Sequence, residues 1–179
     1  MRDGRLSSFG RAVVRECERL GVIVDVTHIP VKAFYDVVEI ARHPIIVSHG
    51  AASSVTTGLD DDRLHALVST RGLIGIHFYT TYLGSNPTVE DVFRQVDYIA
   101  EIFGIDHVAL GIDFFPTEGP WKDLQIAQGT TNLEWAIKDM REMPKVTACL
   151  LDHGYSEDDI RKVLGLNFLR VCRDVLSPR

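Results

Sequence analysis

The chain has 179 residues, of which 45% are hydrophobic and 25% charged, and this balance predicts one folded domain with a sizeable core. Its 19 basic and 25 acidic residues give a net charge of −6, spread along the sequence, which argues against a nucleic-acid binder or a basic membrane-surface protein. No apolar run approaches the roughly 18 residues of a spanning helix, and the N-terminal segment lacks an apolar signal core, so we expect a cytoplasmic protein.

The first predicted unit is a helix followed by a strand. Ser7 or Ser8 is expected to cap the helix, and Gly21 is expected to end it in a left-handed conformation. Residues 22–26 form an apolar run broken only by an aspartate, which is typical of a strand covered on both faces. This strand is expected to end at His28.

Three more units repeat the same order. Pro30 opens a helix that a His-Pro pair breaks, and the strand at residues 45–47 ends at His49. In the third unit, Asp60, Asp61 or Asp62 is expected to begin a helix, and the strand at 73–76 ends near His77. In the fourth unit, Thr88 is expected to cap a helix, and the strand at 108–112 ends at Asp113. The alternation predicts an α/β domain over residues 1–179 with about four parallel strands and covering helices.

The remaining third of the chain is expected to hold a loop and two helices. Residues 114–132 are rich in Gly, Pro and Thr, which predicts a long loop over the strand ends and a candidate lid. One helix is expected from Leu133 to His153 with an interruption near Pro144, and a last helix is expected to begin after Ser156.

The ends of the predicted strands carry the side chains that indicate chemistry. Ligands of parallel α/β folds bind at the carboxyl ends of the strands, where His28, His49, His77 and Asp113 are expected to lie. Imidazoles from neighbouring strands together with a carboxylate are the ligands that Zn²⁺ takes in proteins. The sequence therefore predicts a metal site.

Other chemistry lacks its usual marks. The sequence has no GxSxG, GxxxxGK[ST] or GxGxxG motif. Ser48 and His49 are neighbours on a strand and should point to opposite faces, so we do not expect them to form a catalytic pair. The remaining histidines are interpreted as structural, and the scattered cysteines as buried thiols: His43, His65, His107, His153, Cys17, Cys149 and Cys172.

Five segments together resemble the C-terminal half of the membrane (renal) dipeptidase family, which consists of zinc metallopeptidases built on a (β/α)8 barrel. The segments are GRAVVRECERLGVIVDVTHIP, PIIVSHGAAS, GLIGIHFYTTYL, GIDHVALGIDF and GYSEDDIRKVLGLNFLRV. The resemblance implies a fold that is the C-terminal half of such a barrel. A length of 179 residues agrees with this, because a complete barrel takes about 250.

The resemblance also implies a site and a reaction. The family holds two zinc ions that share a bridging glutamate, and the second zinc takes two histidines, which correspond to His28 and His49. Asp113 corresponds to the aspartate that transfers a proton and contacts the substrate amino group. The implied activity is metal-assisted hydrolysis of dipeptides or related small amides.

Two features depart from the family pattern. The first zinc of the family is held by an HxD motif and the bridging glutamate, and no histidine here is followed two residues later by aspartate. Most first-zinc ligands are therefore absent from this chain. The family has a carboxylate-binding arginine where this chain has the stretch TTGLDDDR, which is shortened and acidic. Arg63 is nearby but falls on a predicted helix, so it is not assigned this role. Without such an arginine, ordinary dipeptides are expected to be held poorly.

Three hypotheses follow. The leading one is the C-terminal portion of a dipeptidase-like enzyme that needs an N-terminal half-barrel, either as a separate chain or because the coding sequence is truncated. The alternative is a non-catalytic half-barrel that acts as an oligomerisation or partner-binding module. The third keeps His28, His49 and Asp113 as a mononuclear site that hydrolyses another amide. An unfinished barrel leaves strand edges and an apolar inner face, which predicts a homo-oligomer or an obligate partner.

Overall fold

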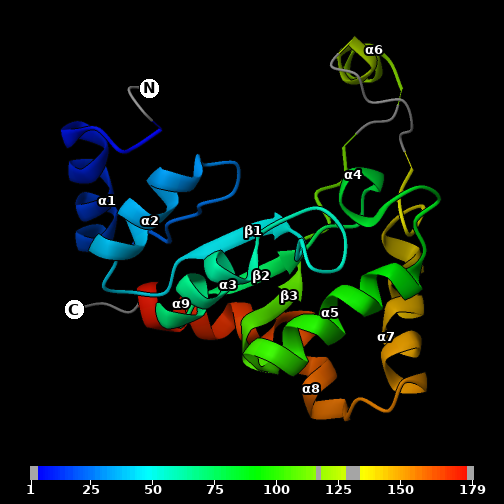
Figure 1. Ribbon diagram of the computed structural model, residues 1–179. Coiled ribbons are helices and arrows are strands. Elements are labelled where there is room, and N and C mark those ends of the chain that lie inside the picture. Colours follow the sequence, from blue (N-terminus) through cyan, green and yellow to red (C-terminus); the bar gives the residue numbers. More distant parts are fainter. Residues whose placement is uncertain (1–3, 116–117, 128–133, 177–179) are drawn as a thin grey trace.

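The computed structural model describes residues 4–115, 118–127 and 134–176 and has an α/β architecture (Figure 1). The strands are β1 (Ile46–Gly50), β2 (Leu73–Ile76) and β3 (Val108–Leu110). The helices are α1 (Ser8–Leu20), α2 (Val31–Ile40), α3 (Asp61–Ser69), α4 (Thr80–Leu83), α5 (Val89–Phe103), α6 (Pro120–Ala127), α7 (Met143–Asp152), α8 (Glu157–Arg161) and α9 (Asn167–Leu176). Short 3₁₀ turns lie at Ile105–His107 and Met140–Glu142, and a π-helical turn lies at Lys162–Leu166.

The three strands form one parallel sheet in the order β1-β2-β3, which confirms the predicted α/β class. The expected first strand at 22–26 makes only one bridge, in which Asp25 pairs with Ile46 of β1. The amide of Val26 donates to the carbonyl of Ile46, and the amide of Ile46 donates to the carbonyl of Val24. The segment therefore runs along the edge of the sheet without becoming a strand, because it makes only these two ladder bonds there.

The predicted helix starts and stops at the caps are confirmed. The Ser7 side chain accepts from the amide of Gly10 at the start of α1, and Gly21 ends that helix with a φ of 69°. Asp60 caps α3 by accepting from the amide of Arg63, and Thr88 forms a capping box at the start of α5. Polar side chains that satisfy free helix amides are local signals, so the sequence alone locates them.

The last third of the chain differs from its prediction in three places. The helix expected from Leu133 begins at Met143, because Pro144 fits the first turn of a helix better than its interior. The last helix is divided at Gly165, whose backbone is not helical. The expected loop at 114–132 contains α6, and its residues 116–117 and 128–132 lie outside the described residues, so the expected lid is not described there.

The two faces of the sheet are covered by different helices. The larger core lies between the outer face of the sheet and α2, α3, α5 and α7, with Val47, Ile74 and Val108 contributed by the strands. Ile46, Leu73 and Ala109 face the other way and pack against α9, which lies below the sheet in Figure 1. Among the described residues, no helix is both long and apolar enough to cross a membrane.

Candidate metal and catalytic site

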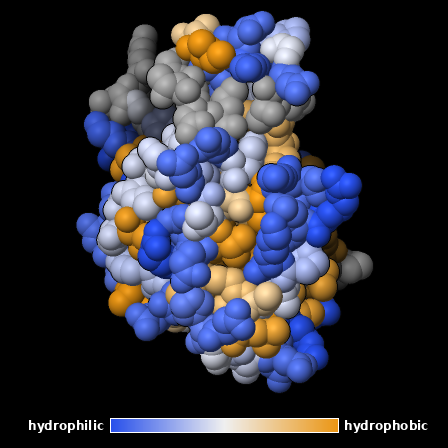
Figure 2. Space-filling view, turned by 90° about the vertical axis from the view of Figure 1, so that its right-hand side faces the viewer, coloured by the Kyte–Doolittle hydropathy of each residue, from blue (hydrophilic) through white to orange (hydrophobic). Residues whose placement is uncertain are grey.

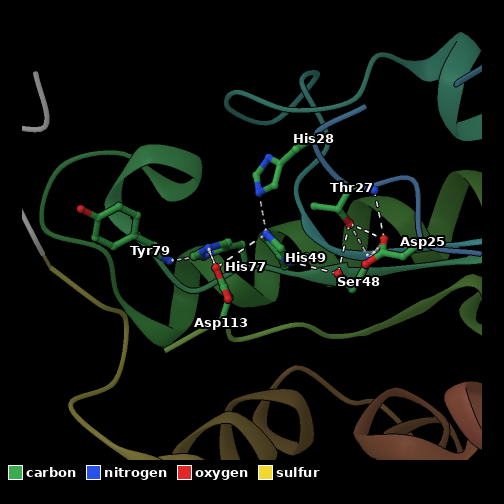
Figure 3. Close-up of polar contacts among 8 residues, drawn as sticks. All are labelled: Asp25, Thr27, His28, Ser48, His49, His77, Tyr79 and Asp113. Carbon is green, nitrogen blue, oxygen red and sulfur yellow. Dashed lines mark hydrogen bonds and ion pairs between the residues drawn. The ribbon is translucent and has the colours of Figure 1, made fainter. Parts of the chain in front are cut away.

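Four titratable side chains meet at the carboxyl edge of the sheet (Figure 3). His28 follows the edge segment, His49 lies in β1, His77 follows β2 and Asp113 follows β3. The strands are parallel neighbours, so the residues that end them come together at one edge. The structure thus brings together all four residues expected at the strand ends, His77 as well as His28, His49 and Asp113, to which the family resemblance assigns roles.

His28 and His49 face each other through the same ring nitrogen. Their Nε2 atoms are 2.9 Å apart, and their ring centroids are 4.8 Å apart. The two nitrogens form a hydrogen bond here. Zinc bonds to imidazole nitrogen at about 2.0–2.1 Å in a tetrahedral geometry, which sets two such nitrogens about 3.3 Å apart, so a small separation of the rings lets both bind one zinc ion. The donor set fits the metal that the sequence predicted.

A row of hydrogen bonds extends from His49 to the edge segment (Figure 3). Ser48 Oγ lies 3.1 Å from His49 Nδ1 and 3.1 Å from Thr27 Oγ1, and Thr27 Oγ1 donates to Asp25 Oδ1 over 2.6 Å. Ser48 and His49 line different cavities, as expected of neighbours on a strand, yet their polar atoms are in contact. The register of β1 against β2 shifts between Val47 and Gly50, and this irregularity allows the contact.

The direction of these hydrogen bonds follows from the protons available. Burial alone would raise the pKa of Asp25, but the hydrogen bonds from Ser48 and Thr27 lower it. Asp25 therefore stays an ionised acceptor. The Ser48 side chain is also hydrogen-bonded to this carboxylate, so the single hydroxyl protons of Ser48 and Thr27 both go to Asp25. The Ser48 oxygen then accepts from Nδ1 of His49, which leaves the lone pair of His49 on Nε2, on the side of His28.

Asp113 lies between two histidines. Its Oδ2 is 3.6 Å from His49 Nε2 and 3.4 Å from His77 Nε2, and its side chain is 48% exposed. The ligand-type atoms of these three residues lie within 4.8 Å of one another. A half-exposed carboxylate beside the buried His77 and the partly buried His49 can contact both a bound ligand and the protein.

His77 has the opposite tautomer from His49. Its Nδ1 accepts the amide of Tyr79 over 3.0 Å, so the ring proton of the neutral imidazole is on Nε2, which faces Asp113. The ring stacks on Tyr82 and Trp135, with centroid distances of 4.6 and 5.7 Å. His77 is therefore a donor to Asp113 rather than a metal ligand. The sequence feature that points to His77 is its position directly after the predicted strand at 73–76.

The backbone is strained at two of the site residues. Four non-glycine residues in the described ranges have a positive φ, and two of them are His28 at 61° and Asp113 at 55°. A non-glycine residue in this region costs about 1–3 kcal/mol and persists only where the surroundings hold it. Such positions cluster at ligand sites, so the strain is a second observation that points to this cluster.

A cavity of about 260 Å³ opens beside the two facing histidines. His28, His49, Arg63 and Tyr82 are among its lining residues. Arg63 is on α3 as predicted, and its guanidinium donates to Asp60 and to the carbonyl of Gly58. The structure therefore places the guanidinium of Arg63 in the same cavity as the predicted metal ligands. The position of Arg63 on a helix does not by itself indicate this.

Sequence comparisons relate the chain to known proteins. The profile of the family described as membrane dipeptidase (peptidase family M19) matches residues 1–177. Dipeptidase tcpJ from Claviceps purpurea (strain 20.1) is 32% identical over 176 residues, which are 95% of this chain and 38% of that protein. The chain thus spans less than half the length of this curated relative.

Solved structures show the same partial coverage. An amidohydrolase from Pseudomonas aeruginosa has a TM-score of 0.89 and 28% identity, over 98% of this chain and 59% of its own. A metallo peptidase from Rhodobacter sphaeroides, liganded with a phosphinate mimic of the dipeptide L-Ala-D-Ala, has a TM-score of 0.80 and 28% identity, over 96% of this chain and 47% of its own. The chain therefore spans about half of these solved chains.

We expect the metal-free chain to lose stability as the pH falls below 6.5. Burial lowers the pKa of His77 from 6.5 to about 4, although Asp113 opposes the shift. The unfolded chain binds this proton at a higher pH than the folded chain, so the contribution is fully present above 6.5 and is lost towards pH 4. The loss is at most about 3 kcal/mol.

Urea unfolding in a chelating buffer between pH 4 and 8 measures this loss. His77→Gln, which cannot take up the proton, should flatten the dependence of the unfolding free energy on pH. Tyr82→Phe keeps the stacked ring and should retain the wild-type dependence. An unchanged dependence in His77→Gln would show that another group is responsible.

Proposed function

The chain belongs to the membrane dipeptidase family, peptidase family M19, and from this membership we propose that it forms the C-terminal part of a zinc-dependent dipeptidase. The convergence of His28 and His49 through their Nε2 atoms is the observation that carries the proposal. A dipeptide or a related small amide is the proposed substrate. The cytoplasmic location expected from the sequence is part of the same proposal.

His28 and His49 are the proposed metal ligands. Bound zinc supplies activation of a water molecule and polarisation of the scissile carbonyl. Asp25 accepts the hydroxyl protons of Thr27 and Ser48, so the Ser48 oxygen accepts from Nδ1 of His49 and the lone pair of His49 stays on Nε2. These three residues therefore act as positioning residues for the metal ligand.

Asp113 is the proposed catalytic residue. Its exposed carboxylate can accept a proton from the attacking water and give it to the departing amine, and it can also bind the substrate ammonium. The Nε2 proton of His77 is directed at the same carboxylate. His77 is thus a positioning residue that holds Asp113 towards the cavity.

The rest of the site and of the barrel is proposed to come from residues beyond these 179. No histidine of the chain begins an HxD motif, so the first zinc of the family would take its ligands elsewhere. The face of the sheet that packs against α9 also carries a cavity of about 310 Å³, where Leu73, Leu164 and Phe168 are among the lining residues. An N-terminal half-barrel, or a second copy of the chain, would pair with the edge of the sheet and close this cavity.

We expect zinc binding and catalysis to separate by residue. His28→Ala and His49→Ala should each weaken zinc binding by more than about tenfold, because even the partners of metal ligands contribute 10–100-fold. Asp113→Asn should keep the zinc and lower kcat by about 10²–10⁴-fold, the usual contribution of a positioned acid or base. Metal analysis and dipeptide hydrolysis measure the two effects.

The assay should use the chain alone and the chain mixed with the N-terminal half-barrel of a family member. Hydrolysis only in the mixture would support the shared site. Hydrolysis by the chain alone would favour the mononuclear alternative. If neither sample hydrolyses a dipeptide or amide, the chain is a non-catalytic module and the proposal is wrong.

A second prediction concerns the carboxylate of Asp25. Asp25→Ala removes the acceptor of the Ser48 proton, so Ser48 can donate to Nδ1 of His49 and move the ring proton to Nε2. We expect zinc affinity to fall by about 10–100-fold. Thr27→Ser keeps the carboxylate and both hydroxyls and should bind zinc as the wild type does. Nitrogen NMR of the zinc-free chain reports the tautomer directly, and an Nδ1 proton that persists in Asp25→Ala would contradict the argument.

Arg63 is the proposed partner of the substrate carboxylate, since it lines the cavity of His28 and His49. Arg63→Met should raise KM for a dipeptide by about tenfold or more, the value of one hydrogen bond to a charged group. KM for the corresponding dipeptide amide, which lacks the carboxylate, should not change. Arg94→Met, on the exposed surface of α5, is the control. An equal effect on both substrates would remove Arg63 from this role.

A further inference from the structure

A second group of metal-binding side chains lies between α5 and α7, outside the site described above. It consists of Glu90, Cys149 and His153, whose ligand-type atoms all lie within 4.8 Å of one another. No local pattern associates them, because Glu90 is 59 residues before Cys149. Their proximity differs from the interpretation of Cys149 as a buried thiol and of His153 as a structural residue.

The geometry brings three different donor atoms together. Glu90 Oε1 is 2.7 Å from His153 Nε2, and Glu90 Oε2 accepts from Cys149 Sγ over 3.4 Å. Cys149 and His153 are four residues apart at the end of α7, so they lie on one face of that helix. The same spacing places the two histidines of the HExxH motif on one zinc ion.

The elements that carry these residues are held firmly. Val92 and Val96 of α5 are fully buried in the same core as Val146 and Leu150 of α7. The ring of His153 stacks on Phe93 of α5, with centroids 3.7 Å apart and an angle of 12° between the planes. A site on two packed helices needs little rearrangement to bind an ion.

We propose that Glu90, Cys149 and His153 form a second binding site for a zinc ion. Thiolate, imidazole and carboxylate are all zinc ligands, and a thiolate disfavours magnesium and calcium. Bonds of about 2.0–2.3 Å to one ion require the three atoms to approach one another slightly, which side-chain rotation at the surface allows. Glu90 and His153 are 49% and 39% exposed, so a fourth position remains open to water.

The surroundings of the thiol favour a cation. Burial and the neighbouring Glu90 carboxylate raise the pKa of Cys149 to about 11, so the residue is a thiol when no ion is bound. A bound zinc ion would replace that proton and balance the negative charge of Glu90. Figure 2 views the molecule from the side on which α7 lies, and hydrophilic residues cover much of that face around a smaller apolar area, as a solvent-accessible ion site requires.

Cobalt(II) distinguishes this site from the one at the sheet edge. Cobalt replaces zinc in sites of this kind, and its bond to a thiolate gives a charge-transfer absorption that histidine and carboxylate ligands do not give. Titration of the chain with cobalt should therefore produce this band, and zinc should remove it by competition. The band should be unchanged in His28→Ala, so the outcome does not depend on the proposed dipeptidase site.

Three variants and one matched control assign the ligands. Cys149→Ala should abolish the band, while Glu90→Ala and His153→Ala should weaken cobalt affinity by at least about tenfold. Cys172→Ala, which removes another half-buried thiol, should retain the band. A band that is absent from the wild type, survives Cys149→Ala or is lost in Cys172→Ala overturns the proposal.

A measurement on the wild type avoids any effect of substitution on folding. Zinc should slow the alkylation of Cys149 by iodoacetamide at least about tenfold, as read by peptide mass spectrometry, and leave Cys17 and Cys172 unaffected in the same sample. Equal alkylation of Cys149 with and without zinc would show that the three residues form only a polar contact between helices.

Discussion

The parallel alignment of β1, β2 and β3 is the constraint on which the site at the sheet edge depends. Parallel neighbours all end at the same edge, so a residue that follows one strand lies beside the residues that follow the next. Each pair of parallel strands needs a helical crossover, and α3 and α5 supply it while they bury the outer face of the sheet. The apolar packing of Val47, Ile74 and Val108 therefore determines where His49, His77 and Asp113 meet.

Within this cluster, neighbouring groups decide which histidine can bind metal. The Ser48 hydroxyl oxygen lies at Nδ1 of His49, and the backbone amide of Tyr79 lies at Nδ1 of His77. An oxygen that must accept leaves the lone pair on Nε2, whereas an amide that must donate leaves the proton there. Two imidazoles whose rings are 5.4 Å apart thus have opposite roles, one as a proposed ligand and one as a donor to Asp113.

This difference explains how far the sequence could lead. Caps at Ser7, Asp60 and Thr88 depend on residues a few positions away, so local patterns predict them. His28, His49 and Asp113 could be selected because they end apolar runs. The contact of Ser48 with His49 could not be predicted from the sequence, because it depends on an irregularity in the pairing of β1 with β2. The incomplete first strand likewise depends on its place at the edge of the sheet.

The two proposed metal sites depend on the fold to different degrees. The sheet-edge site draws on four segments between His28 and Asp113 and requires a positive φ at both of those residues, so the whole sheet must hold it in place. That strain costs about 1–3 kcal/mol at each residue, and bound metal would repay part of it by favouring the strained conformation. The site of Glu90, Cys149 and His153 needs only the packing of α5 on α7. Completion of the barrel should therefore matter for the first site and not for the second, because only the first lies at the sheet edge, where an N-terminal half-barrel would supply the ligands that this chain lacks.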